Sequence, residues 1–260
     1  MQAWHRSRLL AKPDQGRSWH LTSTCVASNH MLHAGKFTRF CDWQFMHRAR
    51  LGVLPLYACR RWDANRDRRC RRCGEYDETT AHVLCHCHIH LATVTRQHNT
   101  ILDRLVDKLQ PQRRAVNVRV NQTVPFSDIL PNVAAIPVEI QRQRPDLLIY
   151  NSADRSVVMV DVTTPFESGP DAFLSARLNK RNHYGDLINL VEAHGIKVTF
   201  EAFVVGALGG WDYQNFRALK ALQVKKRCSS LLARFCCSDA IRWSRDIYIE
   251  HVTGHRQYPP

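Results

Sequence analysis

Two aspartates, Asp146 and Asp161, carry the most informative chemistry in this sequence. Each lies in an apolar run, residues 144–150 and 157–163, and the turn-forming residues 151–155 separate the two runs. This pattern predicts a β-hairpin, and pairing Tyr150 with Val157 places the two aspartates opposite each other, about 5 Å apart. Two carboxylates this close in an apolar setting need a compensating cation, which predicts a Mg²⁺ or Mn²⁺ site for phosphodiester hydrolysis. The alternative is that one aspartate ends its strand in solvent and the other caps a turn.

The next element supplies cations. Residues 172–193 have a helical pattern that Gly195 ends, and Arg177 and Lys180 fall in the middle of its apolar face. We predict that Lys180 orients the attacking water or stabilises the pentacovalent phosphate, and that Arg177 and Tyr184 hold the scissile phosphate. The alternative is that both cations extend to solvent along their aliphatic stems.

A second constellation has the spacing of a zinc site. Cys70-x₂-Cys73-x₈-His82-x₄-Cys87 offers the thiolate and imidazole ligands of tetrahedral Zn²⁺, with a tight turn at Gly74. Cys85 is an alternative fourth ligand, and reduced cysteines that pack as small apolar residues are the alternative to a metal site. Four protein ligands predict a structural ion rather than a catalytic one.

Arginines surround this zinc knuckle. We predict a phosphate-binding surface, as opposed to a merely solvated charged face, formed by Arg66, Arg68, Arg69, Arg71 and Arg72.

These residues together resemble a known family. Pro145-Asp146, fourteen residues, Asp161 and then a lysine is similar to the PD-(D/E)XK restriction-like nucleases, although Thr163 stands where the common motif has its lysine. A lysine moved to the following helix, as Lys180 is here, resembles the endonuclease at the C-terminus of site-specific non-LTR retrotransposon proteins. The resemblance also includes the knuckle, His98-Asn99 and residues 161–167 and 238–246, and it covers the chain from about Gly35 onward. One departure is Gln97, where the family has a basic residue.

The resemblance implies a function and its partners. Such a domain nicks its DNA target in the nucleus, and the freed 3′-hydroxyl primes reverse transcription of the element RNA. It implies structural Zn²⁺ with Cys87 as the fourth ligand, catalytic Mg²⁺ or Mn²⁺, and a polymerase that we expect upstream of Met1 or lost. The main alternative is a nucleic-acid-binding module whose nuclease is inactive, and a second is a zinc-binding adaptor without nucleic acid. Glu167 is either a third acid or a charge at a helix start.

Composition agrees with a polyanionic partner. The 260 residues carry a formal net charge of +14, and no apolar run approaches the about 18 residues of a membrane span. Met1 is not followed by a secretory signal, so we expect the ten cysteines to be reduced and the clustered ones to bind metal.

We therefore expect an α/β (α+β) chain with a restriction-endonuclease-like mixed sheet flanked by helices. Its predicted parts are a basic, partly helical segment (1–62), the CCHC knuckle (63–92) and the endonuclease (93–255), with separate cores for the last two. Further helices are predicted at 36–51, 93–109, 214–224 and 226–252, a third strand at 196–205, and a loop or short strand at 125–137.

Overall fold

A computed structural model describes residues 2–12, 14–34, 36–59, 67–109, 116–133 and 135–258. The helices are α1 (Gln2–Leu10), α2 (Trp19–Thr22), η1 (Val26–Asn29), α3 (Met31–Ala34), α4 (Phe40–Arg50), η2 (Tyr57–Cys59), η3 (His82–His86), η4 (His88–His90), α5 (Leu91–Val106), α6 (Phe126–Ile129), α7 (Val138–Gln141), α8 (Ala172–His183), α9 (Gly185–Ala193), α10 (Asn215–Ala221) and α11 (Lys226–Thr253). The strands are β1 (Val116–Val120), β2 (Leu147–Asn151), β3 (Ser156–Thr163) and β4 (Lys197–Val204).

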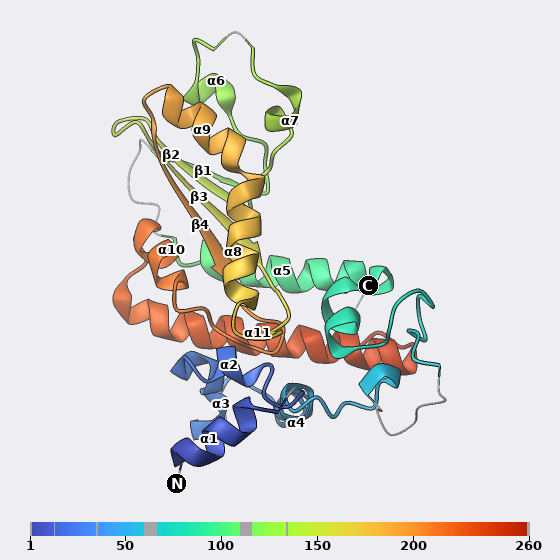
Figure 1. Ribbon diagram of the computed structural model, residues 1–260. Helices are drawn as coiled ribbons and strands as arrows, with labels where there is room; N and C mark the ends of the chain where they lie inside the picture. The colour runs from blue at the N-terminus through green and yellow to red at the C-terminus, as the bar shows by residue number, and fades with distance from the viewer. Residues whose placement is uncertain are drawn as a thin grey trace.

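The four strands form one mixed sheet in the order β1-β2-β3-β4 (Figure 1). The β1–β2 and β2–β3 pairs are antiparallel, and β3 and β4 are parallel. Tyr150 pairs with Val157, as the sequence predicts, and the last pair of the hairpin ladder is Leu147 with Val160. One further step along this register places Asp146 opposite Asp161.

Alternation along β3 explains the helical layers on both faces of the sheet. Val157 and Met159 pack with α8 and α9, whereas Val160 and Val162 pack with α5, α10 and α11. Because successive side chains of a strand point to opposite faces, an apolar run of this length requires cover on both sides. Figure 1 shows these layers, with the long α11 running beneath the end of the sheet.

The knuckle shares a hydrophobic cluster with its neighbours. Val83 and Leu84 pack with Met46 of α4 and with Ile241 and Ile247 of α11. The two clusters that cover the sheet contain no described residue of 63–92, so the expectation of separate cores agrees with this part of the structure. It is wrong for α11, which contributes to the cluster of the knuckle and to a cluster of the sheet. The boundaries at 62/63 and 92/93 stay predictions.

The chain is thus a mixed α/β protein, as the sequence predicts, with local differences. The predicted helix 172–193 is two helices that meet at Tyr184, and α9 ends before Gly195, whose φ of 73° is easy only for glycine. Strand β1 has no counterpart in the sequence prediction, and residues 125–137 contain the short helix α6 instead of a strand. Within the described residues, no helix combines the length and apolar character needed to span a bilayer.

Candidate functional site

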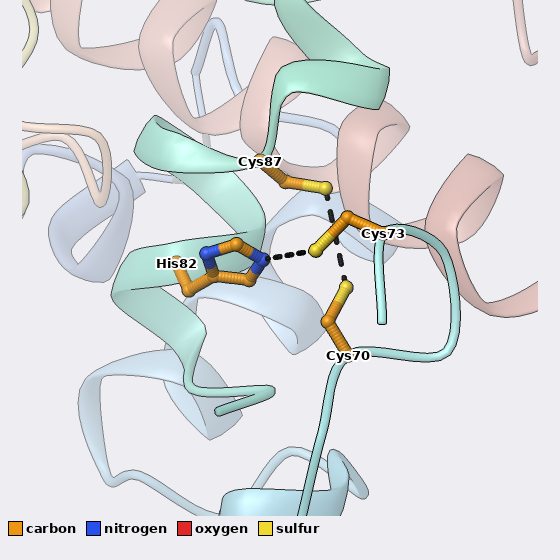
Figure 2. A group of neighbouring side chains, drawn as sticks. All are labelled: Cys70, Cys73, His82 and Cys87. Atoms are coloured by element: carbon orange, nitrogen blue, oxygen red, sulfur yellow. Dashed lines mark hydrogen bonds between the residues drawn. The ribbon is translucent and has the colours of Figure 1, made fainter. Parts of the chain in front are cut away.

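The four predicted zinc ligands converge on one point (Figure 2). A turn at Gly74, whose N–H donates to the Cys70 carbonyl, brings Cys70 and Cys73 together, and η3 supplies His82 and leads into Cys87. The ligand atoms all lie within 4.8 Å of one another. The geometry therefore gathers the side chains that the spacing selects.

The distances fit one tetrahedral ion. Zn–S bonds of about 2.3 Å and Zn–N bonds of about 2.0 Å place tetrahedral ligands roughly 3.5–3.8 Å apart. The Cys70 and Cys87 sulfurs are 4.0 Å apart, and Cys73 Sγ is 3.3 Å from His82 Nε2. Burial and the neighbouring thiols raise the pKa of Cys87 to about 12, so that thiol needs a cation to become a thiolate.

Cys85 points away from this centre. Its Sγ lies 3.7 Å from the carbonyl oxygen of Thr164, and it packs against the cluster that contains Val83 and Leu84. Burial raises the pKa of this thiol well above its usual range. The geometry therefore favours Cys87 over Cys85 as the fourth ligand.

A buried ionic network joins the knuckle to the end of α11. Glu78 is fully buried and accepts hydrogen bonds from Arg71 Nε at 2.6 Å and from the Tyr57 N–H at 2.7 Å, and it lies 2.8 Å from His251 Nε2. Burial works against the charge of Glu78, but the bonds from His251 and Arg71 outweigh it and hold the pKa of this carboxyl far below its usual range. His90 Nε2 lies 3.0 Å from His251 Nδ1 and extends the chain. The network fixes the knuckle against the helix that also covers the sheet.

The predicted phosphate-binding arginines have protein partners. Arg71 binds Glu78, and Arg72 Nε donates to the His251 carbonyl at the end of α11. Arg68 and Arg69 are exposed and form ion pairs with Asp77 and Asp67 at 3.0 and 2.8 Å. Arg66 lies outside the described residues. The cluster therefore divides into two structural arginines and two that face solvent.

The two aspartates lie at the open end of the hairpin. Asp146 Oδ2 accepts the N–H of Val162 at 2.6 Å, so its side chain reaches across to β3. The exposed fractions of Asp146 and Asp161 are 9% and 2%. Burial and, second, the negative charge of Asp146 raise the pKa of Asp161. Two buried carboxylates at one site create the demand for positive charge that the sequence predicts.

Lys180 and Tyr184 both reach Asp161. Lys180 Nζ lies 2.5 Å from Asp161 Oδ2, in an ion pair that does not have hydrogen-bond alignment. The Tyr184 hydroxyl lies 2.8 Å from Asp161 Oδ1 and 3.1 Å from the carbonyl oxygen of Arg144. Burial and the Asp161 charge raise the pKa of Tyr184 above its ordinary value. The hydroxyl therefore keeps its proton and donates a hydrogen bond to Asp161. Lys180 is thus at the acidic pair, although its catalytic role stays a prediction.

Arg177 is not placed beside Lys180 at this pair. Its Nε lies 2.6 Å from Asp212, its Nη2 donates to Asn215 Oδ1 at 2.9 Å, and its Nη1 contacts the carbonyl of Ala202. These bonds tie α8 to β4 and to the start of α10. Because each nitrogen of the buried guanidinium has a protein partner, Arg177 has a structural role. This argues against the predicted contact with the scissile phosphate.

Glu167 is also placed elsewhere. Its buried carboxylate accepts the N–H groups of Leu208 at 3.0 Å and Gly210 at 2.9 Å. Burial raises its pKa despite these bonds. The structure gives Glu167 the role of holding the loop after β4, and neither of the two roles weighed from the sequence.

His98 is the site residue that residue types and spacing alone did not assign. Its Nε2 lies 3.1 Å from Asp146 Oδ1, while Gln97 turns the other way and donates to the Ala240 carbonyl at 2.8 Å. Adjacent helical residues point in directions about 100° apart. Helix α5 therefore packs on α11 through Gln97 and reaches the acidic pair through His98. In the sequence, His98-Asn99 is one of the motifs that resemble the family, but the resemblance assigns no role to His98.

Comparison of the sequence with protein-family models and with curated proteins gives no match.

Proposed function

We propose that this protein is a metal-dependent endonuclease that cleaves the phosphodiester backbone of DNA, with its chemistry at Asp146 and Asp161. The observation that carries the proposal is the pair of buried carboxylates at the open end of the β2–β3 hairpin, with a lysine on one and a histidine on the other. The restriction-endonuclease-like topology, the nuclear location, the element RNA as partner and the origin in a non-LTR retrotransposon belong to the same proposal. They rest on the resemblance of the motifs.

The donor set suits a hard divalent cation. Asp146 and Asp161 supply carboxylate oxygens, which Mg²⁺ and Mn²⁺ prefer. A bound ion would supply Lewis-acid stabilisation of the phosphate and a water of lowered pKa. The chain's own residues prepare this site, because Lys180 offsets the negative charge of Asp161, the His98 imidazole contacts Asp146, and Tyr184 fixes the orientation of Asp161.

Lys180 has the clearest role in the chemistry. Its ammonium is partly exposed while the carboxylate it touches is buried, with side-chain exposures of 34% and 2%. It therefore stands between the acidic pair and solvent, where a scissile phosphate arrives. From there it stabilises the negative charge that develops on the phosphate.

The test is nicking of supercoiled plasmid with Mg²⁺ or Mn²⁺. Asp146→Asn and Asp161→Asn should each lower the nicking rate by about a thousandfold, since both remove a ligand charge whose effect amounts to several kcal/mol. The matched control is Asp154→Asn, which changes an exposed aspartate in the turn of the same hairpin. Equal nicking by wild type and both site variants would overturn the proposal.

A second candidate is a nucleic-acid-binding module with an inactive nuclease. The observation that favours it is that each carboxylate already has a cationic or histidine partner within the protein, so the site is satisfied without a metal. Calorimetric titration with Mn²⁺ distinguishes the two. An active nuclease binds Mn²⁺ and loses this binding in Asp161→Asn, whereas the module binds DNA and shows no such metal site.

A further inference from the structure

Helix α4 carries a column of stacked rings on its outer side. Phe40 and Trp43 stack with 5.7 Å between ring centroids and an interplanar angle of 15°, and Trp43 stacks on His47 at 5.5 Å and 12°. Among the ring contacts of the described residues, these are the two with near-parallel planes. Positions 40, 43 and 47 are three and four residues apart, which places them on one helix face.

Both ends of the column are exposed to solvent. Phe40 is 71% exposed and His47 is exposed, while Trp43 is half-buried and packs against the cluster of α4, the knuckle and α11. Beside Phe40 and Trp43 is a hollow of about 460 Å³ that is also lined by Met31, Leu32 and Thr38. An exposed flat ring at the end of a fixed stack offers one free aromatic face.

The charge around the column selects the occupant. Residues 1–59 contain eight lysines and arginines against two acidic residues. Lys36 and Arg48 are exposed, and in the sequence they lie four residues before Phe40 and one residue after His47. Arg39 forms a 2.7 Å ion pair with the buried Asp42. A positive surface with a free aromatic face matches a single-stranded nucleic acid, whose phosphates bind the cations and whose unpaired bases stack on the ring. A duplex has its bases stacked on each other and presents no such face.

We propose that α4 is a binding platform for single-stranded nucleic acid, on which an unpaired base stacks against Phe40 and the adjoining backbone lies along Lys36 and Arg48. In Figure 1, α4 and the sheet lie on opposite sides of α11. It does not require that the proposed nuclease is active, and it adds a site for the unpaired strands that accompany nicking.

The test measures fluorescence anisotropy of labelled oligo(dT) and oligo(U) of about 12 nucleotides, within the usual site sizes of such surfaces, and of a duplex of equal length. With the full chain, Phe40→Ala should weaken single-strand binding about tenfold and leave duplex binding unchanged, because one stacked base is lost. The slope of affinity against salt should stay the same, since no charge is removed, whereas Arg48→Gln should make it shallower. Phe40→Trp, which keeps an aromatic face at this position, should bind single strands as wild type does.

Tyr213→Ala is the matched control, because Tyr213 has the same 71% exposure on a different part of the surface. It should bind single strands as wild type does. Comparing oligo(dT) with oligo(U) shows which strand the platform prefers, and a thermal melt of Phe40→Ala checks that the variant is folded. Asp161→Asn should lose nicking and keep single-strand binding, which separates failure of the platform from failure of the nuclease.

Two results would overturn the platform. One is single-strand binding by Phe40→Ala equal to wild type. The other is a loss of binding that is as large for the duplex as for single strands. The same holds if Phe40→Ala changes self-association in sedimentation instead of strand binding, because a second copy of the chain would then cover the column.

Discussion

The cysteine-histidine knuckle and the acidic pair both bring potential metal ligands together, but the ligand atoms of the two sites have different neighbours. In the knuckle, the ligand atoms of Cys70, Cys73, His82 and Cys87 face one another within 4.8 Å. At the acidic pair, Asp146 and Asp161 each contact a basic side chain of the protein. The difference teaches that the knuckle ligands need an ion to hold them together, whereas the two carboxylates already have protein partners and would, in the proposed function, bind an ion only for its chemistry.

Removal of zinc should produce the largest effect. Structural zinc sites bind with apparent free energies of about 10–16 kcal/mol near neutral pH, and most of this energy is folding energy. Because Glu78 contacts His251, and Val83 and Leu84 pack with Ile241 and Ile247, the loss should extend from the knuckle into the C-terminal half of α11. Hydrogen exchange with and without a chelator should show faster exchange at residues 70–90 and 241–253 and little change in β2 and β3.

Two cysteine variants give the matched control. Cys87→Ser should lose bound zinc and reproduce the exchange pattern of the chelated protein, whereas Cys85→Ala should keep one zinc per chain. Unchanged exchange in α11 would show that the shared cluster does not transmit the loss and would return the knuckle to the status of a separate unit.

Lys180→Ala should come next in size. The nicking rate at saturating metal should fall about 10²- to 10³-fold, as expected when one preorganised charge is removed from a transition state. At the same time the Mn²⁺ concentration for half-maximal nicking should fall, because the ammonium no longer competes for Asp161. The measurement is a metal titration of the nicking rate.

The control for Lys180 is Lys197→Ala, an exposed lysine at the start of β4. It should leave both the rate and the metal requirement unchanged. A Lys180 variant that nicks at the wild-type rate would remove the lysine from the proposed chemistry while leaving the metal site itself in place.

The two sites also differ in how far the sequence predicts them. The knuckle ligands lie within 18 residues, so spacing alone selects them, and only the choice between Cys85 and Cys87 needed the direction in which each side chain points. The acidic pair depends on strand register, which one pairing of Tyr150 with Val157 fixes for the whole hairpin. Both predictions rest on local geometry.

The parts that the sequence did not predict depend on distant segments. Arg177 lies on the apolar face of its helix as the pattern indicates, but its partner Asp212 is 35 residues away, beyond β4. Asp146 and His98 meet because α5 packs on α11 through Gln97, a contact with residues more than 140 positions later. Strand β1 follows residues outside the described part of the chain and has no turn signal that pairs it with β2.

Arg177→Lys should affect the fold more than the proposed binding. A lysine cannot reproduce the contacts with Asp212, Asn215 and the Ala202 carbonyl, and breaking a buried ion pair costs about 3 kcal/mol or more. For a chain of this size, about 3 kcal/mol corresponds to a fall of roughly 6–12 °C in Tm. DNA affinity and its salt slope should not change. The reverse result, an unchanged melt with a shallower salt slope, would restore Arg177 to the predicted contact with phosphate.

The smallest expected effects separate the arginines around the knuckle. Arg69 is exposed and paired only with the exposed Asp67, so Arg69→Gln should leave thermal unfolding unchanged. If Arg69 contacts phosphate, the salt slope of DNA binding should fall by about one unit. Arg71 instead serves the buried Glu78, so Arg71→Gln should cost about 1–3 kcal/mol of stability because the carboxylate loses a partner.

The pair works as an internal comparison, because each variant removes one positive charge from the same stretch of chain. A melt and a salt titration of both proteins give four values, and the expected pattern is a change in slope for Arg69 and a change in Tm for Arg71. If neither variant alters the salt slope, the exposed arginines are a solvated face, and the nucleic acid must bind through α4 or the basic start of α11 around Lys225, Lys226 and Arg227.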